Sequence, residues 1–257
     1  MVTHGGIPQI FGPNPLKGKV AIVTGASRGI GRAVALGYAQ AGAAVCCAAR
    51  TTKEIDELVS QITKEGGKAI SVTTDQGDLR SVENMVNATV KAFGGLDIMF
   101  ANAALTTLVG PVVDSDPEVW RDIVQVNLVG AYYCARASIP HMKARGAGKI
   151  IFVGSGHGHT ASPFNTAYSS AKAGMWMLTR ALAAEVWQDN ISVNEFTPGR
   201  VKTTAYERGV LGGGHAPERP AEWVKEPEDC VPIALFMACQ PDKGPTANTY
   251  TLNRRFN

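Results

Sequence analysis

The stretch Lys19-Val20-Ala21-Ile22-Val23-Thr24 runs directly into Gly25-Ala26-Ser27-Arg28-Gly29-Ile30-Gly31. Its first part is a short, almost continuously apolar run, which is typical of a strand buried on both faces of a parallel sheet. A helical pattern of apolar residues follows the glycines through Tyr38. A strand, a glycine turn and a helix in this order predict an α/β fold built on a parallel sheet.

The glycine turn is placed to bind phosphate. In such a unit the backbone amides and the helix N-terminus face an anion, and a dinucleotide pyrophosphate is the usual ligand. Glycines let the turn bend and let the backbone approach the ligand closely. No Lys-Ser or Lys-Thr follows Gly31, so a Walker loop is excluded. A glycine turn that is only structural remains the alternative.

The second predicted strand, residues 43–49, ends at Arg50. An acidic residue at this strand end binds the ribose hydroxyls of NAD, whereas an arginine suits the 2′-phosphate of NADP. Arg28, inside the glycine turn, is a second candidate ligand for that phosphate. These residues favour NADP(H) without excluding NAD(H). The alternative is that Arg50 only caps an exposed strand end.

Strand and helix patterns continue to alternate along the chain, as right-handed βαβ units require. Further strands are predicted at residues 68–73, 96–100, 149–153, 191–196 and 249–252. Further helices are predicted at residues 54–64, 84–93, 118–143, 167–187 and 228–238. Pro232 is unfavourable in the last of these unless it lies in the first turn. We expect a single Rossmann-type, doubly wound domain with a seven-stranded parallel sheet over residues 17–257, after an irregular Gly- and Pro-rich arm at 1–16.

Composition narrows the class of protein. The 257 residues are 45% hydrophobic and 18% charged, which allows a large core. A formal charge of +3 gives no argument for nucleic acid or an anionic membrane as a partner. No apolar run reaches the about 18 residues of a membrane span, and residues 1–16 do not resemble a signal peptide. The five cysteines have no metal-site spacing. We expect a soluble cytoplasmic protein with buried free thiols and no metal.

Tyr168 and Lys172 lie four residues apart in a predicted helix, so their side chains share one face. A phenol has an ordinary pKa of ~10 and needs a stabilised phenolate to exchange protons near neutrality. An ammonium at ~4 Å contributes ~4 kcal/mol at an effective dielectric of ~20, enough to lower that pKa by ~3 units. The pair is a plausible acid/base device, although by itself the spacing also fits an ordinary surface helix.

The segment from Thr24 to Gly31, followed at a distance by Tyr168-x-x-x-Lys172, resembles the short-chain dehydrogenase/reductase family over residues 17–252. Ser155 lies 13 residues ahead of Tyr168, where the family places its catalytic serine. Asn127 matches the asparagine that bends the long helix and holds a water beside the catalytic lysine. The resemblance implies a catalytic tetrad of Asn127, Ser155, Tyr168 and Lys172.

The resemblance also implies how a dinucleotide is bound. Asp75 would receive the adenine amino group, the Gln76 backbone would lie beside the ring, Val201 would meet the nicotinamide amide and Thr203 a phosphate. The expected cofactor-binding residues are Gly25, Ser27, Arg28, Gly29, Ile30, Gly31, Arg50, Asp75, Gln76, Asn102, Tyr168, Lys172, Pro198, Gly199, Val201 and Thr203.

Some segments depart from the family pattern. Ala101-Asn102-Ala103-Ala104 stands where relatives have Asn-Asn-Ala-Gly, so we assign Asn102 to the wall of the cofactor site. Residues 253–257 replace the usual Asp-Gly-Gly, and Arg254 and Arg255 there belong to a solvated tail, to a neighbouring subunit contact or to the substrate mouth.

The expected substrate contacts are Ser155, His157 and Tyr168, under a lid at residues 204–226. Reading Ser155 and His157 as a hydrolase pair fails because no Gly-x-Ser-x-Gly elbow is present. Reading His157 and His159 as metal ligands fails because no third ligand is evident.

The sequence thus predicts an NADP(H)-dependent oxidoreductase that interconverts a small ketone or aldehyde and an alcohol, with Tyr168 as acid/base. The alternatives are a 3-oxoacyl-thioester reductase, an NAD-dependent polyol or alcohol dehydrogenase and, remotely, a non-catalytic NADP sensor. Asp189-Asn190 ahead of the sixth strand disfavours an acidic carrier protein, because many carrier-dependent relatives have a basic residue there. The resemblance implies a homotetramer or homodimer.

Overall fold

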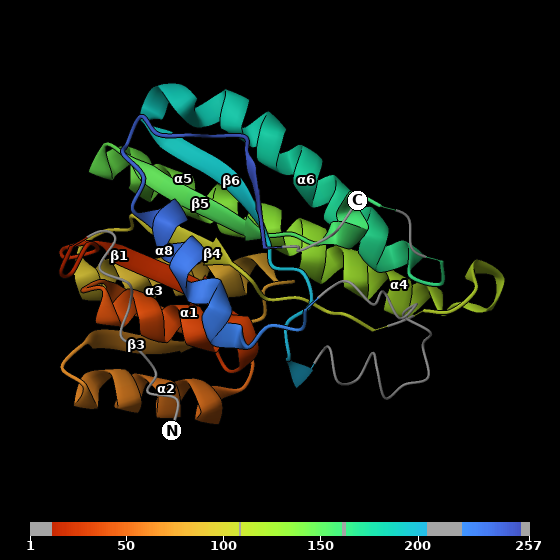
Figure 1. Ribbon diagram of the computed structural model, residues 1–257, viewed down its shortest axis with the longest axis horizontal. Helices are drawn as coiled ribbons and strands as arrows, with labels where there is room; N and C mark the ends of the chain where they lie inside the picture. Colours follow the sequence, from red (N-terminus) through yellow and green to blue (C-terminus); the bar gives the residue numbers. More distant parts are fainter. Residues whose placement is uncertain (1–11, 108, 161–162, 205–222, 253–257) are drawn as a thin grey trace.

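The computed structural model describes residues 12–107, 109–160, 163–204 and 223–252. Seven parallel strands form one sheet in the order β3-β2-β1-β4-β5-β6-β7 (Figure 1). The strands are β1 (Val20–Thr24), β2 (Ala44–Ala49), β3 (Lys68–Thr73), β4 (Ile98–Ala101), β5 (Gly148–Val153), β6 (Ile191–Thr197) and β7 (Thr249–Thr251). The predicted doubly wound, seven-stranded parallel sheet is confirmed.

Helices cover both faces of the sheet (Figure 1). The α-helices are α1 (Gly29–Gln40), α2 (Thr52–Lys64), α3 (Leu79–Phe93), α4 (Pro117–Val124), α5 (Gly130–Arg145), α6 (Thr166–Val186) and α8 (Val231–Ala238). One core cluster joins α1, α2 and α8 to the sheet, and a second joins α3, α5 and α6 to the opposite face. The strand order reverses between β1 and β4, where doubly wound folds bind their ligands at the carboxyl ends of the strands.

Two helices differ from their predicted bounds for local reasons. The helix predicted from residue 84 begins at Leu79, because Asp78 caps its N-terminus by accepting a 2.9 Å hydrogen bond from the Ser81 amide. The helix predicted at 118–143 is three pieces: α4, a π-helical turn η3 (Gln125–Val129) and α5. Both differences bear on the site, since α3 follows Asp75 and the π turn contains Asn127.

The C-terminal helix also has a local explanation. Residues 227–230 form a 3₁₀ turn, η6 (Pro227–Cys230), and α8 starts at Val231. Pro232 therefore lies in the first turn of α8, where its missing N–H costs no helical hydrogen bond.

The last residue of the arm predicted at 1–16, Leu16, belongs to the packed core. Leu16 is buried, and its amide donates a 2.9 Å hydrogen bond to the Ala41 carbonyl. Residues 1–11 lie outside the described part of the chain. The five cysteines are free thiols, as predicted, and only Cys239 is partly exposed. Across the described residues, no helix is long and apolar enough to cross a membrane.

Candidate active site

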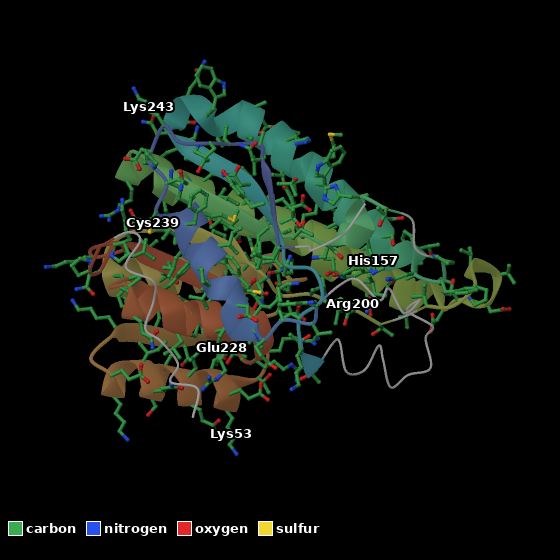
Figure 2. All side chains as sticks on the ribbon, viewed as in Figure 1. Lys53, His157, Arg200, Glu228, Cys239 and Lys243 are labelled. Carbon is green, nitrogen blue, oxygen red and sulfur yellow. The ribbon has the colours of Figure 1, made fainter. Side chains whose placement is uncertain are left out.

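A cavity of about 420 Å³ opens at the carboxyl ends of the central strands. Figure 2 shows His157 and Arg200, two of its lining residues, at this end of the sheet, opposite the end at which Cys239 and Lys243 lie. All but two of the predicted site residues line it. They are Gly25, Ser27, Arg28, Gly29, Ile30, Arg50, Asp75, Gln76, Asn102, Ser155, His157, Tyr168, Lys172, Pro198, Gly199, Val201 and Thr203. The two others do not line it: Gly31 lies close to the Gly25 carbonyl, and Asn127 donates to the carbonyl of the lining residue Leu105.

The glycine turn requires its glycines. Gly25 and Gly29 have φ values of 64° and 54°, in the left-handed region that side chains disfavour. A Cβ on Gly31 would collide with the Gly25 carbonyl oxygen. The first turn of α1 has no acidic side chain, and Arg28 at the N-cap makes no side-chain cap. The amides at this helix end are therefore left for an anion, which fits a dinucleotide pyrophosphate.

The ends of β1 and β4 are joined by Thr24 and Asn102. The Thr24 Oγ1 accepts hydrogen bonds from the amides of Asn102 at 2.9 Å and Ala103 at 3.1 Å. The Asn102 Nδ2 donates to the Thr24 carbonyl at 2.9 Å. This joint is complete even though Ala101 and Ala104 depart from the family pattern. Asn102 thus ties the floor of the cavity together, in keeping with its assignment to the wall.

Gln76 takes part through its side chain, which the sequence analysis did not foresee. The side chain is buried and accepts a 2.6 Å hydrogen bond from the Thr24 hydroxyl. Its Nε2 donates to the Ala103 carbonyl at 3.0 Å and to the Val126 carbonyl at 3.1 Å. Gln76 therefore connects β1, the segment after β4 and the π turn below the cavity.

Two arginines stand at the end of the cavity formed by the glycine turn and the end of β2. Arg28 belongs to the glycine turn and Arg50 follows the end of β2; both are exposed and line the cavity. Asp75 lies in the same wall beyond β3 and accepts a 2.8 Å hydrogen bond from the Gly77 amide. Two cations on this side fit a dinucleotide that carries an additional phosphate on its adenosine ribose.

Ser155, Tyr168 and Lys172 meet at the opposite end. Ser155 follows β5 and begins the 3₁₀ turn η4 (Gly156–Gly158). Tyr168 and Lys172 lie one turn apart on α6, and the Lys172 Nζ is 5.5 Å from the centre of the Tyr168 ring. His157 stands edge-on to Tyr168, with 6.2 Å between ring centres. The helical face predicted from the four-residue spacing is present.

Burial sets the protonation of this cluster. Burial raises the pKa of the Tyr168 phenol, and its hydrogen bond with Ser155 opposes that rise. Burial lowers the pKa of the Lys172 ammonium to about 8, against the opposing effect of the Glu195 carboxylate. The Lys172 Nζ donates a 2.7 Å hydrogen bond to the Val153 carbonyl at the end of β5. A phenol and an ammonium thus share a sheltered wall, as proton transfer to a bound molecule requires.

Asn127 acts on the site through the backbone. Its side chain is fully buried in the π turn, and its Nδ2 donates 2.8 Å hydrogen bonds to the carbonyls of Leu105 and Ile123. Leu105 lines the cavity. Because the bond to Ile123 takes the carbonyl four residues back, Asn127 sits where the regular helix is interrupted, as the resemblance implied.

Other residues near the site were missing from the sequence analysis. Glu195, within buried β6, pairs with His159 at 3.0 Å. Asn165, the residue before α6, is buried in the cavity wall. A charged residue inside a predicted buried strand was the available signal for Glu195, since such a group needs a partner. The predicted lid falls largely on residues 205–222, which lie outside the described residues, as do Arg254 and Arg255.

Comparisons with known proteins agree with this geometry. A sequence model described as short chain dehydrogenase matches residues 19–210. The chain is 34% identical over 238 residues to dehydrogenase/reductase SDR family member 4 of Rattus norvegicus, covering 89% of this chain and 83% of that protein. It is 40% identical over 194 residues to an NADP-dependent mannitol dehydrogenase of Hypocrea jecorina, covering 73% of this chain and 72% of that protein.

Solved structures give the same relationship. A short-chain type dehydrogenase/reductase from Mycobacterium marinum superposes with a TM-score of 0.84 at 32% identity, covering 92% of this chain and 94% of that chain. A Beutenbergia cavernae protein, described as an NAD(P)-dependent gluconate 5-dehydrogenase and solved with bound NADP at low occupancy, superposes with a TM-score of 0.82 at 32% identity. That alignment covers 93% of this chain and 97% of that chain.

Proposed function

Since this chain belongs to the short-chain dehydrogenase/reductase family, an oxidoreductase family acting on CH–OH groups, we propose that it interconverts a small ketone or aldehyde and its alcohol with NADP(H). The observation that carries the proposal is the cluster of Ser155, Tyr168 and Lys172 in the wall of one cavity with the glycine turn. A dinucleotide hydride carrier bound along that cavity would contact the glycine turn at one end and this cluster at the other.

In the proposed mechanism the nicotinamide supplies or accepts the hydride when it is bound. The Ser155 hydroxyl hydrogen-bonds the substrate oxygen and fixes it beside Tyr168. The Tyr168 phenol donates a proton to that oxygen in reduction and takes it back in oxidation. The Lys172 ammonium lowers the pKa of the phenol and binds the nicotinamide ribose. Asn127 holds Leu105 in the wall and supports the proton relay beside Lys172.

The preference for NADP(H) is supported by charge. Arg28 and Arg50 line the end of the cavity at which the adenosine phosphate of NADP would be bound. A charged hydrogen bond contributes ~1.5–3 kcal/mol, so one arginine favours NADP by ~10- to 150-fold. The mannitol dehydrogenase relative is NADP-dependent, and the Beutenbergia structure contains NADP. We assign residues Asp75, Pro198, Gly199, Val201 and Thr203 to the same binding site.

A polyol and its keto form are the substrate pair to test first, because one relative is a mannitol dehydrogenase. His157, exposed beside Tyr168, is the proposed contact for a further substrate hydroxyl. A carrier-bound 3-oxoacyl thioester is disfavoured, because Asp189-Asn190 places an acidic residue ahead of β6. We also propose that the protein is cytoplasmic and forms a homotetramer or homodimer. Sedimentation at micromolar concentration tests the oligomeric state.

The deciding experiment is a titration of the purified protein with NADPH and, separately, NADH, followed by nicotinamide fluorescence. We expect NADPH to bind at least ~10-fold more tightly, and Arg50→Ala to remove most of that difference. Lys91→Ala, which removes an exposed cation near the end of α3, is the matched control and should leave both affinities unchanged. Equal or tighter NADH binding would overturn the preference and direct the substrate screen to NAD with alcohols and polyols.

A further inference from the structure

Glu195 is a carboxylate without any solvent exposure, in the middle of β6. Both of its oxygens face the His159 Nε2, at 3.0 Å and 3.2 Å, and the Thr249 hydroxyl on β7 donates to it at 2.8 Å. The His159 side chain is 30% exposed, so the pair runs from the sheet interior to the surface. A buried charge of this kind costs stability unless it is paired, and here two polar atoms, the His159 Nε2 and the Thr249 Oγ1, converge on it.

The Glu195 carboxylate contacts both ends of the segment that carries Ser155. At the first end, a Cβ on Gly154 would collide with the Glu195 Oε1, so only glycine leaves room for this carboxylate. The Gly154 amide donates a 2.8 Å hydrogen bond to the Phe196 carbonyl on the same strand. At the other end, His159 follows the turn η4 directly. Ser155 and His157 are therefore held between two points fixed by one side chain.

The same carboxylate lies beside the anchor of Lys172. The Lys172 Nζ binds the Val153 carbonyl at 2.7 Å, and the next residue, Gly154, lies against the Glu195 carboxylate. Ammonium and carboxylate thus flank one short piece of backbone. Lys172 is 1% exposed, and in low dielectric an ammonium there requires a countercharge. Glu195 opposes the effect of burial on the Lys172 pKa.

Trp176 and Arg180 are the other aromatic and charged groups near the pair on α6. His159 lies edge-on to Trp176, one turn beyond Lys172 on α6, with 5.6 Å between ring centres. The Arg180 guanidinium stands 4.5 Å from the same Trp176 ring and donates to the Ala247 carbonyl. Arg180 is engaged by Trp176 and by the Ala247 carbonyl, so Lys172 is the cation that the Glu195 carboxylate serves.

We propose that Glu195 and His159 form a positioning pair for the catalytic centre, in which the Glu195 carboxylate holds the Ser155 segment in place and keeps the buried Lys172 ammonium charged. The catalytic consequence rests on the proposed function; the pairing of charges does not. Neither residue touches the substrate in this assignment. Glu195 acts through Lys172 and Gly154, and His159 acts through Glu195.

The first test reads the charge of Lys172 without any activity. In protein labelled with ¹³C-lysine, the Lys172 ε-carbon signal, assigned by its loss in Lys172→Met, is followed through a pH titration of the full chain. We expect Glu195→Gln to lower the midpoint by about one pH unit, because a countercharge is removed. The matched control is Glu185→Gln, which removes an exposed carboxylate from α6, the helix that carries Lys172. This variant should leave the midpoint unchanged. An unchanged midpoint in Glu195→Gln would overturn the charge role.

The second test separates positioning from mere packing. In carbonyl reduction the alkaline limb of the kcat profile depends on protonated Lys172 beside Tyr168, and removal of the Glu195 charge lowers the Lys172 pKa. Glu195→Gln should therefore move that limb to lower pH, whereas a packing defect would lower kcat equally at all pH values. If the wild type reduces no carbonyl compound, the proposed function fails while the titration result stands.

The His159 variants keep the proposal testable if Glu195→Gln does not fold. His159→Ala removes the donor to the carboxylate, and we expect kcat to fall about tenfold or more with KM for NADPH unchanged. His159→Gln, whose amide can donate to the same oxygen, should recover most of that loss. Equal kcat values in wild type and His159→Ala, or equal losses in both variants, would overturn the positioning role of His159.

Discussion

The Asn102 side-chain Nδ2 donates a 2.9 Å hydrogen bond to the Thr24 carbonyl, across the point where the strand order of the sheet reverses. Thr24 leads into the glycine turn, and Asn102 follows β4 toward Leu105, which also lines the cavity. One polar joint therefore sets the relative position of the two halves of the site. Its geometry depends on partly buried hydrogen bonds, whose loss leaves unpaired groups behind.

Replacement of Asn102 tests this joint. In Asn102→Ala the Thr24 carbonyl loses its side-chain donor, and we expect the free energy of unfolding to fall by about 1–3 kcal/mol and NADPH binding to weaken. Urea denaturation and fluorescence titration measure the two effects. Asn87→Ala, at an exposed position on α3, is the control and should change neither. An unaffected Asn102→Ala protein would show that backbone contacts alone hold the strand ends together.

Tyr168→Phe separates chemistry from binding. It removes the phenolic hydroxyl while the ring and its contact with His157 remain. We expect kcat to fall by at least ~10²-fold with NADPH affinity nearly intact. Steady-state kinetics and the fluorescence titration measure this, with Tyr132→Phe on the exposed face of α5 as control. Retained activity would refute the acid/base role.

The buried Lys172 predicts a pH dependence of stability. Its pKa falls from 10.5 to about 8 on folding, so between those values the unfolded chain binds more protons and stability rises with pH. The charged lysine costs the native state about 3 kcal/mol below pH 8, and this cost is relieved above it. Relative to Lys172→Met, the wild type should gain about 2 kcal/mol between pH 7 and pH 9.5 in denaturant titrations. A constant difference would mean that the ammonium is solvated.

Gly31 and Gly174 form a matched pair of helical glycines with opposite expected outcomes. In Gly31→Ala the new Cβ meets the Gly25 carbonyl oxygen, which is backbone, so the glycine turn must distort and NADPH binding should be lost. In Gly174→Ala the new Cβ meets the end of the Leu128 side chain, which can move. That variant should bind NADPH normally. Thermal unfolding shows whether either protein is folded before binding is measured.

Structural features set by local sequence pattern are predictable from this chain. The apolar run before Gly25 and the turn glycines lie where the pattern placed them, because a strand buried on both faces has little choice of composition. The spacing of Tyr168 and Lys172 fixed a shared helical face directly. These features depend on residues close together in the chain.

Contacts between residues that are distant in the chain are not predictable in this way. Gln76 was assigned through its backbone, yet its side chain bonds to Thr24, 52 residues away, and to Val126, 50 residues away. Glu195 was predicted only as part of the sixth strand, because its partner His159 comes 36 residues earlier and no local pattern links the two. No helical or strand period relates such pairs, since tertiary packing alone brings them together.

The π turn at Gln125–Val129 has a consequence for the surface of the molecule. One additional residue in a helical turn rotates the side chains of the preceding turns by about 100° around the helix axis, relative to those that follow. The Trp120 indole, on α4, donates to the Thr166 hydroxyl at the start of α6, two residues ahead of Tyr168. Without that additional residue, Trp120 would face away from α6. The π turn thus sets the rotation of α4 relative to α5. As a result, α4 packs against α6, while α5, which continues the same helical segment, packs against the sheet.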